Sequence, residues 1–177
     1  HVIAATIPSC RAYDPCFGYG LAAIIRDGMR RMLDAQEDVF YYITVMNENY
    51  VQPALPAGAE QGILRGLYQV REAPDAAVQL LGSGTILREA LAAAEMLEQD
   101  FGIAANVWSV TSYSELRRDG LDVERWNTLN ATAPQRTSHV EQCLTASAGP
   151  IVAASDYVRA LPDLIRTWVP RRYITLG

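Results

Sequence analysis

The turn Gly82-Ser83-Gly84 is the residue pattern with the clearest chemical potential, and it stands between a short apolar run and an amphipathic segment. Backbone N–H groups and the dipole at the start of a helix favour an anion, so such a turn could hold a phosphate. A dinucleotide fingerprint needs a third glycine where Leu87 stands, and a phosphate loop needs a Gly-Lys-Ser/Thr that the chain lacks. Because backbone sterics alone require glycine at a tight turn, we favour a strand-to-helix turn over an anion site.

Ser138-His139 beside Glu141 suggests acyl transfer, but a nucleophile and its base must be adjacent in space rather than in sequence. We therefore expect a surface histidine at this position. The run Asn47-Glu48-Asn49 follows a β-prone stretch and could form a polar site at a strand end. We favour loop capping for these three residues.

The acidic residues Asp119, Asp122 and Glu124 surround Gly120 and could hold a divalent cation. They lack the spacing of a Ca²⁺ loop, so a solvated helix junction is the better interpretation. The chain has two histidines, His1 and His139, and zinc ligation is therefore not expected.

Three cysteines leave one unpaired in any disulfide scheme, and they form no C-x-x-C motif. This pattern indicates reduced thiols in a cytosolic protein. We expect Cys10 and Cys16 to be buried small apolar residues rather than nucleophiles.

The composition is that of a globular chain, with 177 residues of which 50% are hydrophobic. No apolar run approaches the roughly 18 residues of a membrane helix, and the first residues lack the features of a signal peptide, which predicts a cytoplasmic location. The net charge of −5 and the dispersed arginines argue against nucleic-acid binding. All 15 basic residues are arginine, which excludes a lysine Schiff base and a lysine-dependent phosphate loop.

Residues 78–120 predict the central structural unit of the chain, a βαβ arrangement. A buried strand ends at Gly82, a helix runs from Leu87 to Phe101 with three-and-four apolar spacing, and Gly102 provides its left-handed end. A second strand over 107–110 follows, parallel to the first through a right-handed crossover. Ser112 and Glu115 form a capping box that should begin another helix at Tyr113.

The flanking elements are predicted from the same kinds of pattern. We expect a strand over 2–7, a helix capped by Asp14 with Pro15 in its first turn, and a central strand over 39–46. The buried face of that helix should contain Phe17, Leu21, Ile24, Ile25, Gly28 and Met32. Residues 47–56 should be an extended connection that contains a domain boundary.

The remainder of the chain should contain a short helix over 57–64 and a strand over 67–70. Past Gly120 we expect a further helix over 123–129, then a loop over 130–138. Residues 140–144 fit either a helix or a strand. A buried strand over 149–154, a helix capped by Ser155 or Asp156, and a last strand over 173–176 complete the prediction.

Three stretches closely resemble one enzyme family, the homodimeric bacterial pyruvate dehydrogenase component that uses thiamine diphosphate. They are residues 40–70, residues 78–120 with Glu124-Arg125-Trp126-Asn127, and Ser155-Asp156-Tyr157 with Arg166-Thr167-Trp168-Val169-Pro170. The likeness extends over nearly the whole chain and is weakest around 128–150.

This resemblance implies a fold and a division into domains. The fold class is α/β, with a three-layer, mostly parallel sheet covered by helices on both faces, as in the transketolase C-terminal domain, preceded by part of a second α/β domain. Residues 1–55 would be the C-terminal part of the middle domain, which faces the cofactor pyrimidine. Residues 56–177 would be the transketolase-like C-terminal domain, truncated at its end.

The resemblance also implies a function for a longer parent protein: oxidative decarboxylation of pyruvate and transfer of the acetyl group to the lipoyl group of an acyltransferase. Its cofactors would be thiamine diphosphate and Mg²⁺, and its partners a second copy and the dihydrolipoyl acetyltransferase core. The family's metal, diphosphate and pyrimidine motifs have no counterpart here, and His1 matches only the last histidine of a His-Glu-Asp-Gly-His-Ser-His run. We therefore expect no catalytic, cofactor-binding or metal-binding residue in these 177 residues.

The segment alone should be inactive and should serve packing and dimer contacts. Two alternatives stay open. One is a free-standing α/β interaction or regulatory module that binds a small anion at Gly82 to Gly84, and the other is a related 2-oxo-acid decarboxylase.

Overall fold

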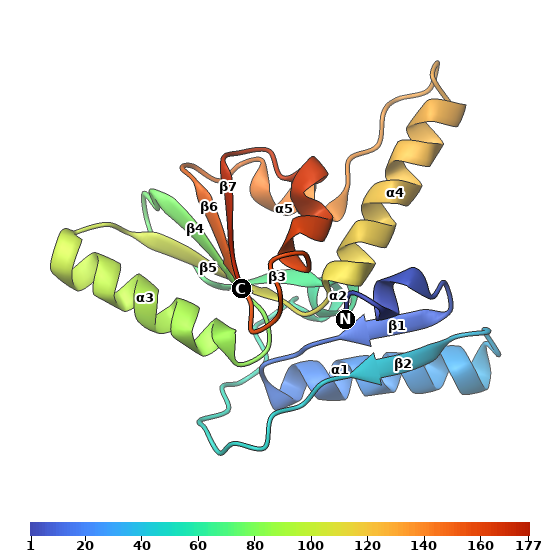
Figure 1. Ribbon diagram of the computed structural model, residues 1–177, viewed down its shortest axis with the longest axis horizontal. Coiled ribbons are helices and arrows are strands. Elements are labelled where there is room, and N and C mark those ends of the chain that lie inside the picture. The colour runs from blue at the N-terminus through green and yellow to red at the C-terminus, as the bar shows by residue number, and fades with distance from the viewer.

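The computed structural model describes all residues 1–177, which form two α/β units packed side by side (Figure 1). The first unit contains β1 (Cys10–Tyr13), α1 (Gly18–Met29) and β2 (Phe40–Ile43). An extended segment then leads to the second unit. Its elements are α2 (Glu60–Arg65), β3 (Leu67–Arg71), β4 (Val78–Gly82), α3 (Ile86–Phe101), β5 (Ala105–Val110), α4 (Tyr113–Leu129), α5 (His139–Leu144), β6 (Ile151–Ala154), the 3-10 helix η3 (Pro162–Trp168) and β7 (Tyr173–Leu176).

The second unit is built on a five-stranded sheet with the order β3-β5-β4-β6-β7. Strands β5, β4, β6 and β7 run parallel, and only the edge strand β3 is antiparallel, paired with β5. The predicted βαβ unit is confirmed, with Leu80 opposite Val107 in the register of β4 and β5. Gly102 ends α3 in the left-handed conformation at φ 64°, and the Ser112 hydroxyl accepts a bond from the Glu115 N–H at the start of α4.

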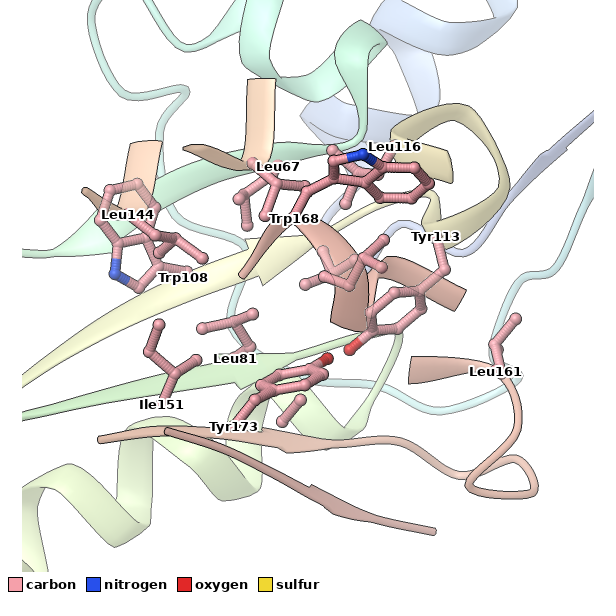
Figure 2. Packing of buried hydrophobic residues seen from close by; sticks show 14 residues of the cluster. Leu67, Leu81, Trp108, Tyr113, Leu116, Leu144, Ile151, Leu161, Trp168 and Tyr173 are labelled. Atoms are coloured by element: carbon pink, nitrogen blue, oxygen red, sulfur yellow. The ribbon is translucent and has the colours of Figure 1, made fainter. Parts of the chain in front are cut away.

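Alternate residues of the central strands pack on opposite faces of this sheet. Leu80 and Val107 contact α3 on one face. Leu81 and Trp108 belong to the larger core on the other face, beneath α4, α5 and η3 (Figure 2). The polar Gln79, which interrupts the apolar run of β4, is fully buried and accepts a hydrogen bond from the Trp108 indole at 3.0 Å. The three-layer, mostly parallel α/β fold is therefore confirmed.

The first unit is a two-stranded parallel sheet in which Cys10 lies opposite Phe40. The predicted strand over 2–7 is wrong, because Ala4–Thr6 form a 3-10 turn and the strand begins at Cys10. The predicted strand over 39–46 exists as β2 but is not central. It has one neighbouring strand, and Phe40 is 48% exposed.

Four further details of the prediction need correction. Phe17 rather than Asp14 is the N-cap of α1, and Ile25 and Met32 of its predicted buried face are exposed. The helix predicted past Gly120 is the second half of α4, which runs unbroken to Leu129. Ser155 caps no helix, because its hydroxyl accepts from the Tyr157 N–H and η3 begins later. Residues 139–144, left open from the sequence, are helical.

None of the helices combines the length and the hydropathy needed to cross a bilayer.

Gly120 sets the closest approach of α4 to η3, and it generates the first prediction. A Cβ atom there would lie 2.4 Å from ring atoms of Trp168, whose indole donates to Glu124. Gly120→Ala should lower the free energy of unfolding by about 1–3 kcal/mol, because the clash exceeds the gain in helix propensity of about 1 kcal/mol. Urea denaturation measures the change.

Gly18 is the matched control for this substitution. It opens α1, and a Cβ atom there would meet its nearest neighbour, the Gln52 amide oxygen, at 3.6 Å. Gly18→Ala should therefore leave stability unchanged or raise it slightly. Equal destabilisation by both substitutions would contradict the account of helix packing at Gly120.

Candidate functional site

The carboxyl ends of five parallel strands meet at one polar cluster between the two units, which we call the strand-end junction. The residues that follow β1, β2, β4, β5 and β6 are Asp14, Thr44, Ser83, Thr111 and Ser155. In open α/β sheets ligands bind beyond the carboxyl ends of the strands, so this junction is the position where a binding site is expected. The two units also contact each other at this junction.

Direct hydrogen bonds connect the units at the strand-end junction. The Asp14 N–H donates to the Thr111 carbonyl at 2.7 Å, and the Gly84 N–H donates to the Asp14 carbonyl at 3.0 Å. The Thr44 hydroxyl lies 2.5 Å from the Asp14 carboxylate, and the His1 ring nitrogen Nε2 lies 3.1 Å from the same hydroxyl. Asp14 therefore connects the ends of β1, β2, β4 and β5.

The Asp14 side chain packs against Gly84. It has φ +51°, and a Cβ atom built there would lie 2.5 Å from the Asp14 carboxylate oxygen Oδ2. At Gly82, a Cβ atom would lie 2.6 Å from the Leu87 Cα. Gly82 is thus required by close packing against backbone and Gly84 by its left-handed backbone conformation, as the turn interpretation expects. A carboxyl of the chain already occupies the turn, which argues against a site for a free anion.

The environment of Asp14 raises the pKa of its carboxyl above the usual value. Burial raises its pKa most strongly, and the charge of Asp156 raises it further. Hydrogen bonds from Thr44 and Ser83 oppose this shift but do not cancel it. The carboxyl is held by hydroxyl donors, and the His1 ring reaches the same Thr44 hydroxyl.

The cavity at the strand-end junction has a volume of about 10 Å³, which is room for about one water molecule. Its lining is shared between the units: His1, Asp14, Ser83, Val110, Thr111, Ser112, Tyr113 and Leu161. The usual ligand position of the sheet is thus filled by side chains of the chain itself.

A second set of contacts covers the outer edge of β1 with the first turns of α4. The hydroxyls of Ser112 and Ser114 donate to the Ala12 carbonyl at 2.6 and 3.2 Å. The Arg118 guanidinium donates to the Pro8 and Cys10 carbonyls at 3.1 and 3.2 Å. Side chains of α4 therefore satisfy the backbone acceptors of β1 that another strand would otherwise take.

An ion network continues this contact. Glu115 pairs with Arg11 at 3.1 Å and with Arg118 at 3.3 Å, and the Glu115 side chain is 13% exposed. The pairs therefore link β1 to α4 in a partly buried environment, where they are screened less than on an open surface.

The residues considered for acyl transfer do not form a catalytic group. Ser138 caps α5 in a reciprocal capping box with Glu141, and its hydroxyl faces that carboxylate. His139 was predicted at the surface, which is wrong. It is 8% exposed, and its Nε2 lies 2.9 Å from the Leu67 carbonyl.

Cys143 lies 3.7 Å from the His139 ring, a proximity that the sequence analysis did not consider. Burial raises the pKa of the Cys143 thiol to about 11 and lowers the pKa of His139. Both groups are therefore neutral near pH 7, unlike the thiolate and imidazolium of a cysteine nucleophile.

The acidic residues around Gly120 lie within α4, not at a helix junction as predicted. Asp119 accepts from Arg65 at 3.2 Å and from the His139 N–H at 2.6 Å, Glu124 accepts from the Trp168 indole, and Asp122 is exposed. No group of three or more histidine, cysteine or acidic residues in the chain is arranged to hold a metal ion.

Of the remaining candidates, Glu48 has a structural partner. Glu48 pairs with Arg88 of α3 at 3.0 Å, and Arg88 lies over the Tyr50 ring, so this loop joins the two units. Cys10 and Cys16 are buried and free, as predicted, and burial raises the pKa of the Cys16 thiol to about 11.

Sequence reasoning missed Asp14 at the strand-end junction and Arg118 in the contact between α4 and β1. Asp14 was assigned to helix capping because β1 was placed over 2–7. A correct assignment of the strand at 10–13 would have put a polar residue directly at its carboxyl end, which is the usual signal of such a position. Arg118 has no comparable signal in the sequence.

The architecture defines the class of protein: an α/β domain of the transketolase C-terminal type next to part of a second α/β unit. Transketolase from Campylobacter jejuni superposes with a TM-score of 0.60 over 99% of this chain and 23% of that chain, at 15% identity. A transketolase of Pichia stipitis gives 0.57 over 96% of this chain and 21% of that chain, at 14% identity. At this identity the likeness shows the fold.

Two parts of the chain match known protein families in sequence. Residues 66–177 match the family described as "Transketolase-like TK C-terminal domain", and the chain belongs to that family. Residues 1–53 match the "Pyruvate dehydrogenase E1 component middle domain".

Relatives named "Pyruvate dehydrogenase E1 component" match nearly the whole chain. The protein of Pseudomonas aeruginosa is 56% identical over 100% of the chain, that of Cupriavidus necator 52% over 100%, and that of Escherichia coli K12 46% over 96%. The resemblance to the bacterial pyruvate dehydrogenase component is thus confirmed. The chain spans about a fifth of the length of these relatives, 20% for the first two and 19% for the third.

Arg118 generates a prediction about the contact between α4 and β1. Arg118→Ala removes the donors to the Pro8 and Cys10 carbonyls and should lower the free energy of unfolding by roughly 1–2 kcal/mol, because an exposed bond to Pro8 and a half-buried bond to Cys10 are both lost. The control is Arg117→Ala, since Arg117 makes no side-chain hydrogen bond. Thermal denaturation of both variants measures the difference, and an equal effect would contradict the role of Arg118.

Proposed function

We propose that this chain is part of a pyruvate dehydrogenase component that oxidatively decarboxylates pyruvate and passes the acetyl group to the lipoyl group of an acyltransferase. The observation that carries the proposal is the 56% identity over the full chain to a protein of that name. The two family matches support it, since they follow one another along the chain without overlap. The parent protein would use thiamine diphosphate and Mg²⁺ in the cytoplasm.

The exposed surfaces of the first unit support its assignment to a larger middle domain. β2 has one neighbouring strand, and on its outer face Phe40 and Tyr42 are 48% and 44% exposed. On α1, Met29 and Leu33 just beyond it are 55% and 64% exposed. Parallel sheets are normally covered on both faces, and two strands alone are only marginally stable. We infer that residues 1–55 are the C-terminal part of that domain and 56–177 the C-terminal domain.

The role we propose for these residues is packing between domains and contact within a homodimer, with the dihydrolipoyl acetyltransferase core as the further partner. The strand-end junction supports a packing role, because five strand ends are joined there by side chains of both units. We propose no residue of this chain as a catalytic group or as a ligand of cofactor or metal.

The reaction is tested on the full-length polypeptide. With thiamine diphosphate, Mg²⁺ and the acyltransferase and dihydrolipoamide dehydrogenase partners, pyruvate should support NADH formation, and 2-oxobutyrate and 2-oxoglutarate should be poorer substrates. Preference for another 2-oxo acid would replace the proposal with a related decarboxylase. Absence of activity with all of them would reject a decarboxylase.

The isolated 177 residues should not bind thiamine diphosphate, because the proposal places every cofactor-binding element outside them. Isothermal titration with thiamine diphosphate and Mg²⁺ measures this, with the full-length polypeptide as the positive control. Saturable binding by the isolated chain would contradict the proposal that the cofactor-binding elements lie outside these residues.

A further inference from the structure

Helix α1 is apolar on two opposite sides. Its inner side packs on the two-stranded sheet through the buried residues Ala23, Ile24 and Gly28. Its outer side points away from that sheet, and α1 lies in the lower part of Figure 1, away from the five-stranded sheet. A surface helix normally has one apolar side, so a second one indicates an interaction surface.

The outer side of α1 carries a continuous apolar stripe with four-residue spacing. Ile25, Met29 and Leu33 are 45%, 55% and 64% exposed, and they line an open groove of about 730 Å³. A step of four residues drifts by about 40° around an α-helix. The chain changes to a π turn over Arg30–Asp34, which winds more slowly and keeps Leu33 in the groove.

A row of charged residues runs along one side of this stripe. Arg26, Arg30 and Asp34 line the same groove, one position after each apolar residue. Arg26 pairs with Glu60 within the chain. Arg30 pairs with Asp27 at 2.8 Å, so its charge is balanced within its own helix, whereas Asp34 makes no ion pair. The row therefore ends in an acid that a basic residue from outside the chain could pair with.

The stripe is complementary to itself when two copies run antiparallel about a two-fold axis. An axis near Met29 brings Ile25 of each copy against Leu33 of the other. It also brings Arg26 of each copy near Asp34 of the other, because the midpoints of the two pairs differ by one residue, about 1.5 Å along the helix. A parallel arrangement would place like charges together. One antiparallel arrangement thus satisfies both the apolar and the charged residues.

Other parts of the same domain are a poorer fit for this stripe. An α/β sheet grows by strands beside β2 and by helices beside α1, within the same layers. Such additions cover the flanks of α1 and leave the side that points away from the sheet to another body. A stable interface buries about 1,200–2,000 Å² in total, more than one helix stripe supplies, so further surfaces of the full-length chain would complete it.

We propose that the outer stripe of α1 is a contact between two copies of the parent chain, antiparallel about a two-fold axis near Met29. This inference rests on the homodimer of the proposed function and names a surface that forms it. The contact is apolar at its centre and has a pair between Arg26 and Asp34 at each end.

Cross-linking of the full-length polypeptide tests the contact. Met29→Cys places two thiols across the axis, so oxidation with copper phenanthroline should convert most of the protein to a disulfide-linked dimer. Met96→Cys is the matched control, since Met96 is a methionine of α3 with similar exposure, 59% against 55%. This control and the unaltered protein should give only the background amount of covalent dimer.

Charge reversal tests the orientation of the two helices. Asp34→Arg sets like charges against each other at both ends of the contact and should raise the dimer dissociation constant at least tenfold in sedimentation equilibrium. Adding Arg26→Asp to the same chain should restore most of the affinity, because each pair forms again with its charges exchanged. Asp122→Arg, the same change on an exposed residue of α4, should leave the dissociation constant unchanged.

Several results would overturn the proposal. Equal cross-linking of Met29→Cys and Met96→Cys, or a monomeric full-length polypeptide, would show that the stripe is not a contact between copies. Resistance of Met29→Cys to maleimide without covalent dimer would show that another part of the same chain covers the stripe. An effect of Asp34→Arg that Arg26→Asp does not relieve would reject the antiparallel arrangement.

The outcome is separable from that of the proposed function. Turnover of pyruvate by a protein whose Met29→Cys variant forms no covalent dimer would reject the contact and leave the function in place. A covalent dimer of a protein that does not act on pyruvate would reject the function and leave the contact in place.

Discussion

The structure depends on one close approach, that of the Asp14 carboxyl to the glycine turn after β4. A Cβ atom at Gly84 would lie 2.5 Å from a carboxylate oxygen, so a larger residue would displace the Asp14 side chain. The contact places the carboxyl ends of two separate sheets at one point. The other joining contacts, which are the α4 side chains on β1 and the pair between Glu48 and Arg88, lie to either side of it.

The same contact determines what this part of the chain can do. The carboxyl ends of parallel strands are the usual place for ligands in an open α/β sheet, and here that place is filled by Asp14, Thr44 and Ser83. The groups with chemical potential elsewhere are paired or neutral, as Cys143 beside His139 illustrates. A role in holding a larger protein together fits these observations, and the relatives named as pyruvate dehydrogenase E1 component are of that larger size.

The two units differ in how completely the apolar faces of their sheets are covered. The five-stranded sheet is covered on both faces, and its core contains fully buried residues such as Leu81 and Ile151. The two-stranded sheet leaves Phe40 and Tyr42 exposed on the side away from Tyr41 and Ile43, which pack inward. Among these residues, the contact with the second unit therefore adds to the stability of the first, since Ile63 and Tyr68 pack in the same cluster as Tyr13 and Ile24.

The sequence by itself determined the elements whose signals are local. The βαβ unit of 78–110 follows from apolar spacing, Gly102 from the need for a left-handed helix end, and the Ser112 cap from the first turn of α4. Each depends on residues within a few positions of one another, so periodicity and steric preference are sufficient. The family resemblance, carried by three stretches of the sequence, was likewise readable without coordinates.

Only the tertiary structure decided the position of β1, the neighbours of β2 and the junction itself. The apolar run at 2–7 has strand propensity, but pairing of Cys10 with Phe40 places the strand later. Thr44, Gly84 and Thr111 meet Asp14 from 30 or more positions away in sequence. Local sequence preferences cannot predict contacts between residues so far apart in the chain, because long-range pairing and desolvation exist only once the two units have packed.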